Sequence, residues 1–233
     1  MDRNNLSTMK ASSHPRLHQL TSTLASLNLK SRLRKCEHVK GKNFIGGLWK
    51  PSKSSLTFLD INPADTRDLI GRFPDSVVED AKEAIDAAKE ALKEWEDMPA
   101  PKRGQILLKA SNLLEERKEE FAELLTREKG KTLAGSGAEV SRAIEIFRYF
   151  AELGYRLRGE SLPSSFRDTL IFTVREPMGI ASIITPWNFP IAIPAWKIAP
   201  ALISGNTVVF KPSLLHAINS PKVSRSVGKG RTS

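Results

Sequence analysis

The sequence is short of the residues that build cysteine or histidine metal sites. Its 233 residues include one cysteine, Cys36, and four histidines, at positions 14, 18, 38 and 216. A single cysteine excludes an intramolecular disulfide, and the histidines all lie outside the periodic stretches, so we expect no metal site. No run of 18 apolar residues occurs, so we also expect no transmembrane helix and no membrane partner.

Acidic residues are scarce only at the two ends of the chain. Residues 1–43 hold nine Lys/Arg and two acids, and residues 214–233 hold four Lys/Arg and no acid. Residues 44–213 hold 23 basic and 24 acidic residues, so the net charge of +10 belongs to the two tails. This distribution argues against a nucleic-acid surface. The alternative, a nucleic-acid binder that uses its tails, predicts a salt-dependent shift of DNA.

The first tail has the composition of a targeting segment. Residues 3–36 contain no acid, seven Lys/Arg and nine Ser/Thr, and leucines recur in them at helical spacing. This pattern resembles an organelle transit peptide and implies a mitochondrial protein. The alternative is a disordered basic tail on a cytoplasmic protein. We predict that residues 1–36 are cleaved or disordered, which amino-terminal sequencing of the cellular protein can test.

Apolar periodicity predicts three helical regions before Gly159. The first opens at Asp75-Ser76, either of which can cap it, and runs to about Trp95. The second begins near Pro101 and ends at Gly130. The third runs from about Ala138 to Tyr155, with an inward stripe of Val140, Ile144, Phe147 and Ala151.

Short apolar segments predict strands around these helices. Phe44–Trp49 is a short strand with a Gly-Gly turn, and Thr57–Ile61 is a strand followed by an Asn-Pro turn. Residues Thr169–Arg175 alternate apolar and polar side chains, which predicts a half-buried strand. Residues 1–43 and 214–233 stay outside this pattern, and the Ser/Gly-rich end of the second tail favours disorder.

A strand–helix–strand pattern occupies residues 180–213. Ile180–Thr185 is a nearly continuous apolar run, typical of a parallel strand buried on both faces. Pro190 suits the first turn of a helix, and Gly205 suits the end of one. Thr207–Phe210 is a second β-branched run. The pattern predicts one βαβ unit, with its two strands adjacent and parallel, as in a doubly wound sheet.

Ligands of such sheets bind beyond the carboxyl ends of the strands, which here carry Asn188 and Lys211. The Asn188 amide can donate a hydrogen bond to an oxygen that develops negative charge. The alternative is that Asn188 only caps the following helix. Lys211 can contact a phosphate or a ribose hydroxyl, although no glycine-rich GxGxxG turn is present.

These residues carry a specific resemblance. The motifs Ile184-Thr-Pro-Trp-Asn-Phe-Pro190, Trp196-Lys197, Gly205-Asn-Thr-Val-Val209 and Lys211-Pro-Ser213 are similar to those of the aldehyde dehydrogenase superfamily. The resemblance covers roughly residues 43–213 and is closest to dehydrogenases of ketoglutarate or succinate semialdehyde. It implies an α/β fold, in which an amino-terminal helical lobe leads into the first βαβ of a doubly wound, Rossmann-like cofactor domain.

The resemblance also implies roles for individual residues. Asn188 would donate to the oxyanion, and Lys197 matches a lysine implicated in proton relay. NAD or NADP would be lined by Ile184, Thr185, Pro186, Trp187, Lys211 and Ser213, and the aldehyde tunnel by Phe189, Ile193 and Trp196. The alternative for the tunnel residues is plain core packing. A segment like residues 158–178 helps to form a small oligomerisation sheet in this family.

The resemblance ends after Ser213. Leu214 stands where the family has an acid that bonds the adenosine ribose, and the family's general-base glutamate and catalytic cysteine have no counterpart. Residues 44–213 are therefore expected to be a truncated cofactor domain, inactive in NAD(P)-dependent oxidation of an aldehyde to a carboxylic acid. The alternative is a non-catalytic interaction protein that pairs with a full-length subunit.

Overall fold

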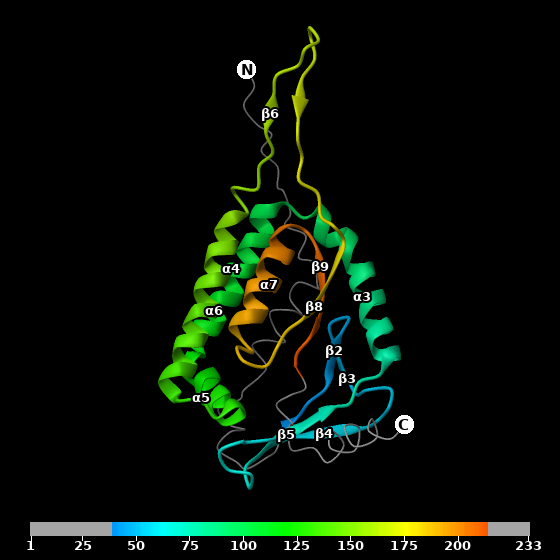
Figure 1. The fold of residues 1–233 in the computed structure, drawn as a ribbon. Helices are drawn as coiled ribbons and strands as arrows, with labels where there is room; N and C mark the ends of the chain where they lie inside the picture. The colour runs from blue at the N-terminus through cyan, green and yellow to red at the C-terminus, as the bar shows by residue number, and fades with distance from the viewer. Residues whose placement is uncertain (1–38, 214–233) are drawn as a thin grey trace, which may run out of the picture. The chain divides into compact units, whose positions relative to one another are not determined.

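The computed structural model describes residues 39–213 (Figure 1), so the predictions for residues 1–36 and 214–233 lie outside the described residues. The helices are α3 (Val78–Asp97), α4 (Ala100–Glu116), α5 (Lys118–Lys129), α6 (Leu133–Leu153) and α7 (Ala192–Ile203). The strands are β1 (Val39–Lys40), β2 (Asn43–Ile45), β3 (Leu48–Lys50), β4 (Thr57–Ile61), β5 (Leu69–Pro74), β6 (Ser161–Leu162), β7 (Ile171–Phe172), β8 (Ile180–Ile184) and β9 (Thr207–Lys211).

The predicted βαβ unit is confirmed. Strands β8 and β9 are adjacent and parallel, with Ile180 beside Thr207 and Ile184 beside Lys211, and α7 connects them. Gly205 has a φ of +92°, which permits the sharp exit from α7 that a side chain would hinder. Gly179 donates its amide hydrogen to the Asn206 side chain at 2.9 Å, so the start of β8 is tied to the start of β9.

The prediction that β8 is buried on both faces is wrong. Ile183 is buried, whereas Ile184 is 71% exposed. Helices α3 and α7 both contact the strand pair, which lies between them in Figure 1. The Thr207 hydroxyl donates to the Ala88 carbonyl of α3, which places that helix beside the amino end of the pair. At the carboxyl end of β8 neither helix covers the Ile184 side chain, which therefore reaches solvent.

The helices pack through small residues. Buried clusters join α4, α6 and α7, with Leu107, Ala151 and Ile203 in one and Ala143, Ile146, Ala195 and Ala199 in another. Helix α5 ends at Gly130, as predicted, because its φ of +66° suits glycine. Helix α6 starts five residues before the predicted Ala138, because the Thr132 hydroxyl caps it by accepting the Gly135 amide hydrogen at 3.2 Å.

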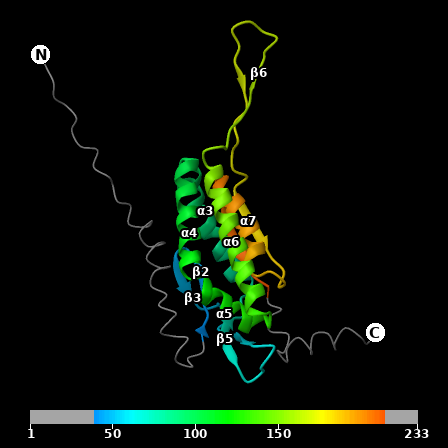
Figure 2. The same cartoon turned by 90° about the vertical axis from the view of Figure 1, so that its left-hand side faces the viewer.

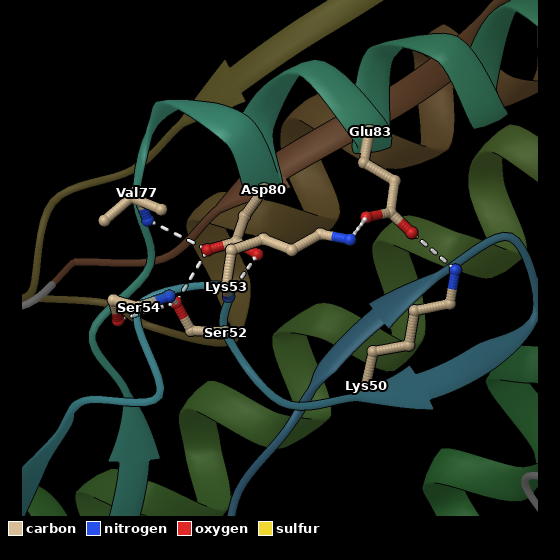
Figure 3. Close-up of polar contacts among 7 residues, drawn as sticks. All are labelled: Lys50, Ser52, Lys53, Ser54, Val77, Asp80 and Glu83. Carbon is tan, nitrogen blue, oxygen red and sulfur yellow. Dashed lines mark hydrogen bonds and ion pairs between the residues drawn. The ribbon is translucent and has the colours of Figure 1, made fainter.

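The prediction that Asp75 or Ser76 caps α3 is wrong, because the capping side chain is Asp80, in the first turn of the helix itself. Its N-cap is Val77, and the buried Asp80 carboxylate accepts the Val77 amide hydrogen at 2.9 Å. The same carboxylate accepts hydrogen bonds from the Ser52 hydroxyl at 2.7 Å and the Lys53 amide at 3.0 Å (Figure 3). Burial raises the pKa of Asp80, but these hydrogen bonds outweigh it and hold the pKa below its usual value.

The strand predicted over Thr169–Arg175 is shorter and more exposed than expected. Only Ile171–Phe172 forms a strand, paired with β6 as an antiparallel hairpin that projects away from the helices in both views (Figures 1 and 2). The alternation therefore reflects a two-stranded ribbon without a helix over either face. Its exposed apolar side chains are Phe166, Leu170, Phe172 and Val174.

Two neighbouring carboxyl groups on β4 and α5 are shielded from solvent to different degrees, since Asp60 is buried and Glu128 is half-buried. Asp60 is 3% exposed, and its Oδ1 has no hydrogen-bond partner within the described part of the chain. Burial raises the pKa of Asp60 to about 6, although the charge of Arg127 opposes the rise. Burial, and then the negative charge of Asp60, raise the pKa of Glu128 to about 7, with Lys129 opposing. Both groups therefore keep their protons to a higher pH in the folded chain than they would in water.

The stability of the folded chain is expected to fall as the pH rises from about 4 to about 7. The folded state keeps protons on Asp60 and Glu128 after the unfolded chain has lost them, so the stabilisation is complete below the unfolded values and is lost through the folded ones. The pKa of Asp60 rises from 3.8 to about 6 and that of Glu128 from 4.5 to about 7, so the loss is on the order of 6 kcal/mol at about 1.4 kcal/mol per pKa unit. Urea unfolding between pH 4.5 and 8 measures it. The double variant Asp60→Asn, Glu128→Gln should flatten the slope, while the exposed control Asp86→Asn keeps it; an unchanged slope in the double variant would contradict the assignment.

Candidate functional site

The predicted cofactor residues meet at the carboxyl ends of β8 and β9. Ile184 pairs with Lys211, and the Thr185 amide donates to the Lys211 carbonyl at 3.5 Å. Thr185 is buried, whereas the side chains of Ile184 and Lys211 are exposed. Pro186 and Ser213 follow the two strand ends directly in the chain. The edge therefore offers an apolar surface and a lysine at the place where open sheets bind ligands.

The loop after β8 leaves the Asn188 side chain in solvent. Helix α7 begins at Ala192. Its N-cap residue is Ile191, whose apolar side chain makes no capping hydrogen bond. The alternative that Asn188 caps the helix is therefore wrong. The prediction that Pro190 lies in the first turn of α7 is also wrong. Pro190 lies in the turn before the helix, and Pro194 lies in the first turn. Asn188 is exposed and makes no hydrogen bond within the described part of the chain, so its side-chain amide can donate to a ligand.

The two aromatic residues that flank Asn188 each lie under a lysine. The Lys129 ammonium is 4.3 Å from the ring centroid of Trp187, and the Lys131 ammonium is 4.5 Å from that of Phe189. Both rings are partly exposed, so each contact contributes about 0.5–1 kcal/mol. Burial is the largest influence on the pKa of Lys129 and lowers it. These contacts hold both neighbours of Asn188 against the turn between α5 and α6.

A buried carboxylate caps α7 in place of the predicted cap. The Glu139 side chain, on α6, is 0% exposed and accepts the Lys131 ammonium at 2.5 Å. Its other oxygen accepts the amide hydrogens of Ile191 at 3.0 Å and Ala192 at 3.3 Å. A negative charge at a helix N-terminus is stabilised by the unpaired amides and by the helix dipole. Glu139 is thus joined to residues more than 50 positions later in the chain, at the end of the loop that carries Asn188.

The remaining predicted site residues lie along α7. Trp196 and Lys197 are exposed, and Ile193 is half-buried. Phe189 and Trp196 are each 43% exposed, so plain core packing does not account for them within the described residues. Their assignment to an aldehyde tunnel, and that of Lys197 to proton relay, stay predictions.

The sequence interpretation missed Lys129, Lys131 and Glu139. Glu139 had a signal, because it lies four residues before the buried Ala143 and so interrupts an inward stripe with a charge. The two lysines flank Gly130, where they read as ordinary cations at a helix end. No local pattern indicated that their ammonium groups reach residues 187 and 189.

Two further searches cover the residues with assigned positions. Across residues 39–213, no cluster of three or more histidine, cysteine, aspartate or glutamate side chains is arranged to bind a metal ion. None of the helices in this range combines the length and the apolar character that crossing a bilayer requires.

Comparisons with known proteins give consistent results. Residues 49–228 match the profile described as "Aldehyde dehydrogenase family". Alpha-ketoglutaric semialdehyde dehydrogenase of Bacillus subtilis is 45% identical over 181 residues, which are 78% of this chain and 37% of that protein. An NADP-dependent enzyme of E. coli superposes with a TM-score of 0.74 and 32% identity, covering 83% of this chain and 40% of that structure. An NAD-dependent aldehyde dehydrogenase of Sinorhizobium meliloti superposes with a TM-score of 0.74 and 29% identity, covering 84% of this chain and 40% of that structure. The chain thus spans about two fifths of the length of the proteins that it matches.

Proposed function

Because the chain belongs to the aldehyde dehydrogenase family, we propose that residues 44–213 supply part of a site for the NAD(P)-dependent oxidation of a semialdehyde to a carboxylic acid. The observation that carries the proposal is the exposed Asn188 amide beside the carboxyl edge of β8 and β9. The semialdehyde class is supported by the name of the Bacillus relative. The cofactor class is supported by the NADP-dependent and NAD-dependent enzymes that superpose on the fold.

The edge of the sheet fits a dinucleotide in its chemistry. Ile184 and Trp187 offer exposed apolar surface, and Lys211 offers a cation to a phosphate or to ribose hydroxyls. A bound nicotinamide would supply the hydride acceptor of the reaction. The part of this chain's own residues is to hold the cofactor at the sheet edge and to donate the Asn188 side-chain hydrogen to the oxygen of the aldehyde as it gains negative charge. In this proposal Phe189, Ile193 and Trp196 contact the aldehyde.

We expect the 233-residue chain by itself to form no detectable NADH or NADPH from succinate semialdehyde or ketoglutarate semialdehyde. The family's reaction begins with a cysteine thiolate, and the only cysteine of this sequence is Cys36, which precedes the described residues. A displacement of a catalytic group by about 1 Å already lowers the rate on the order of a hundredfold. Absorbance at 340 nm is the measurement. Turnover near 10 s⁻¹, a typical enzyme value, that disappears in Cys36→Ser would contradict this expectation.

Binding of the cofactor tests the proposal independently of turnover. Titration of NADH and NADPH, followed by their fluorescence, should show weak binding that Lys211→Met weakens further by about tenfold, since one charge contact is worth about 1.4 kcal/mol. Lys93→Met, an exposed lysine of α3, is the matched control. Failure of the unmodified chain to bind either nucleotide at millimolar concentration would refute the cofactor site.

A second candidate function is pairing with a full-length family subunit, and the exposed β6–β7 hairpin favours it. Phe166 and Leu170 are each 75% exposed, and a projecting apolar ribbon is typical of a protein interface. Co-expression with a tagged full-length dehydrogenase should give co-purification that Phe166→Ser, Phe172→Ser reduces by at least tenfold. Ile85→Ser, on the exposed side of α3, is the control. Equal recovery of the hairpin variant would exclude the hairpin as the interface.

A further inference from the structure

The loop of residues 185–191 contacts charged side chains from α6, from the turn before it and from the end of α5. We propose that Glu139 is a positioning residue, whose carboxylate sets the place of this loop and so of the Asn188 amide. The inference deepens the proposed function and rests on it for the role of Asn188. Its structural part, the anchoring of the loop by Glu139, stands on the contacts alone.

The burial of Glu139 needs a reason beyond stability. Removing a carboxylate from water costs several kcal/mol, and a well-packed apolar residue is often as stable in such a place. Here the charge is compensated by one ammonium and two amide hydrogens, all within 3.3 Å. The two amides begin α7, where no local side chain caps the helix. The carboxylate therefore fixes the position of the Ile191 and Ala192 amides, which an apolar side chain could not do.

Lys131 extends this anchor to the residue after Asn188. Its ammonium reaches the Glu139 carboxylate at 2.5 Å and also lies 4.5 Å from the centre of the Phe189 ring. On the other side of Asn188, the Lys129 ammonium lies 4.3 Å from the centre of the Trp187 ring. The loop is thus held through the side chains of Trp187 and Phe189 and through the backbone of Ile191, while Asn188 is exposed and makes no hydrogen bond within the described residues. A donor held in this way needs little rearrangement when charge develops on a ligand oxygen.

Amide hydrogen exchange of the full chain tests the anchor without any turnover. In Glu139→Ala, the amides of Ile191 and Ala192 should exchange at least tenfold faster, while the interior of α7 at Ala199 changes little. The indole N–H resonance of Trp187, assigned with Trp187→Phe, should shift as the loop moves. Glu139→Gln keeps one carbonyl acceptor for the two amides and should recover most of the protection and the resonance position.

The control variant is Glu145→Gln, an exposed acid on the same helix, which should leave both signals unchanged. If Glu139→Ala does not fold, the comparison is made between Glu139→Gln and Lys131→Met, of which only the second loses the contact with Phe189 and should shift the Trp187 signal. NADH binding, measured in parallel, should weaken about tenfold in Glu139→Ala and recover in Glu139→Gln.

The outcomes separate the inference from the proposed function. Unchanged exchange at Ile191 and Ala192, or a uniform rise over all helices that Glu139→Gln does not reverse, would overturn the positioning role. If the unmodified chain binds neither nucleotide, the cofactor site fails. The exchange and indole signals then still decide whether Glu139 anchors the loop.

Discussion

Replacing Gly104 by alanine is expected to lower the free energy of unfolding by about 3 kcal/mol, a large part of the stability of an ordinary domain. Gly104 is buried where α4 crosses α6, and a Cβ atom there would lie 2.3 Å from the Ala151 carbonyl oxygen. Gly154 makes the reciprocal approach, with a Cβ position 2.6 Å from the Ala100 carbonyl. Because both obstacles are backbone, no side chain can turn away, and the two helices would have to separate.

Gly137→Ala is the matched control for this prediction. Gly137 is also within a helix, but a Cβ there meets nothing within 4 Å. Alanine should therefore stabilise the chain by about 0.5–1 kcal/mol through helix propensity. Urea unfolding of both variants measures the difference. Equal effects of the two substitutions would show that the α4–α6 contact is looser than the structure has it.

Replacing Arg103 by methionine is expected to cost about 3 kcal/mol of unfolding free energy. The Arg103 side chain is buried, and its Nε donates to the Ile203 carbonyl at the end of α7 at 3.1 Å. Its Nη1 donates to the Met98 carbonyl and, at 3.3 and 3.4 Å, to the Glu96 and Trp95 carbonyls at the end of α3. The last carbonyls of a helix have no partner within it, and hydrogen bonds from a charged donor contribute about 1.5–3 kcal/mol each.

The loss should be concentrated at the junction between α7 and β9. Amides of residues 204–207 are expected to exchange faster in Arg103→Met, because the end of α7 is no longer held to the end of α3. Arg103→Lys should recover little, since one ammonium cannot reach two helix ends as a planar guanidinium does. Arg142→Met, an exposed arginine of α6, is the control. Full stability of Arg103→Lys would contradict the two-ended role.

Features that depend on neighbours in the chain could be predicted from the sequence. The end of α5 at Gly130 and the turn at Gly46-Gly47, whose φ angles are +59° and +79°, follow from the freedom of glycine. The βαβ unit followed from two β-branched runs on either side of a helical period. The family followed from motifs around Asn188 and Lys211, and the match over residues 49–228 confirms it.

Features that depend on distant partners were decided only by the tertiary structure. The cap of α3 comes from Asp80 with Ser52, and the cap of α7 comes from Glu139, so Asp75, Ser76 and Asn188 were wrong choices. The exposure of Ile184 on β8 depends on which elements pack beside the strand pair. In each case a group contacts a residue that is far away in the sequence. The spacing of residues along the chain does not indicate which distant residues come together when the elements pack.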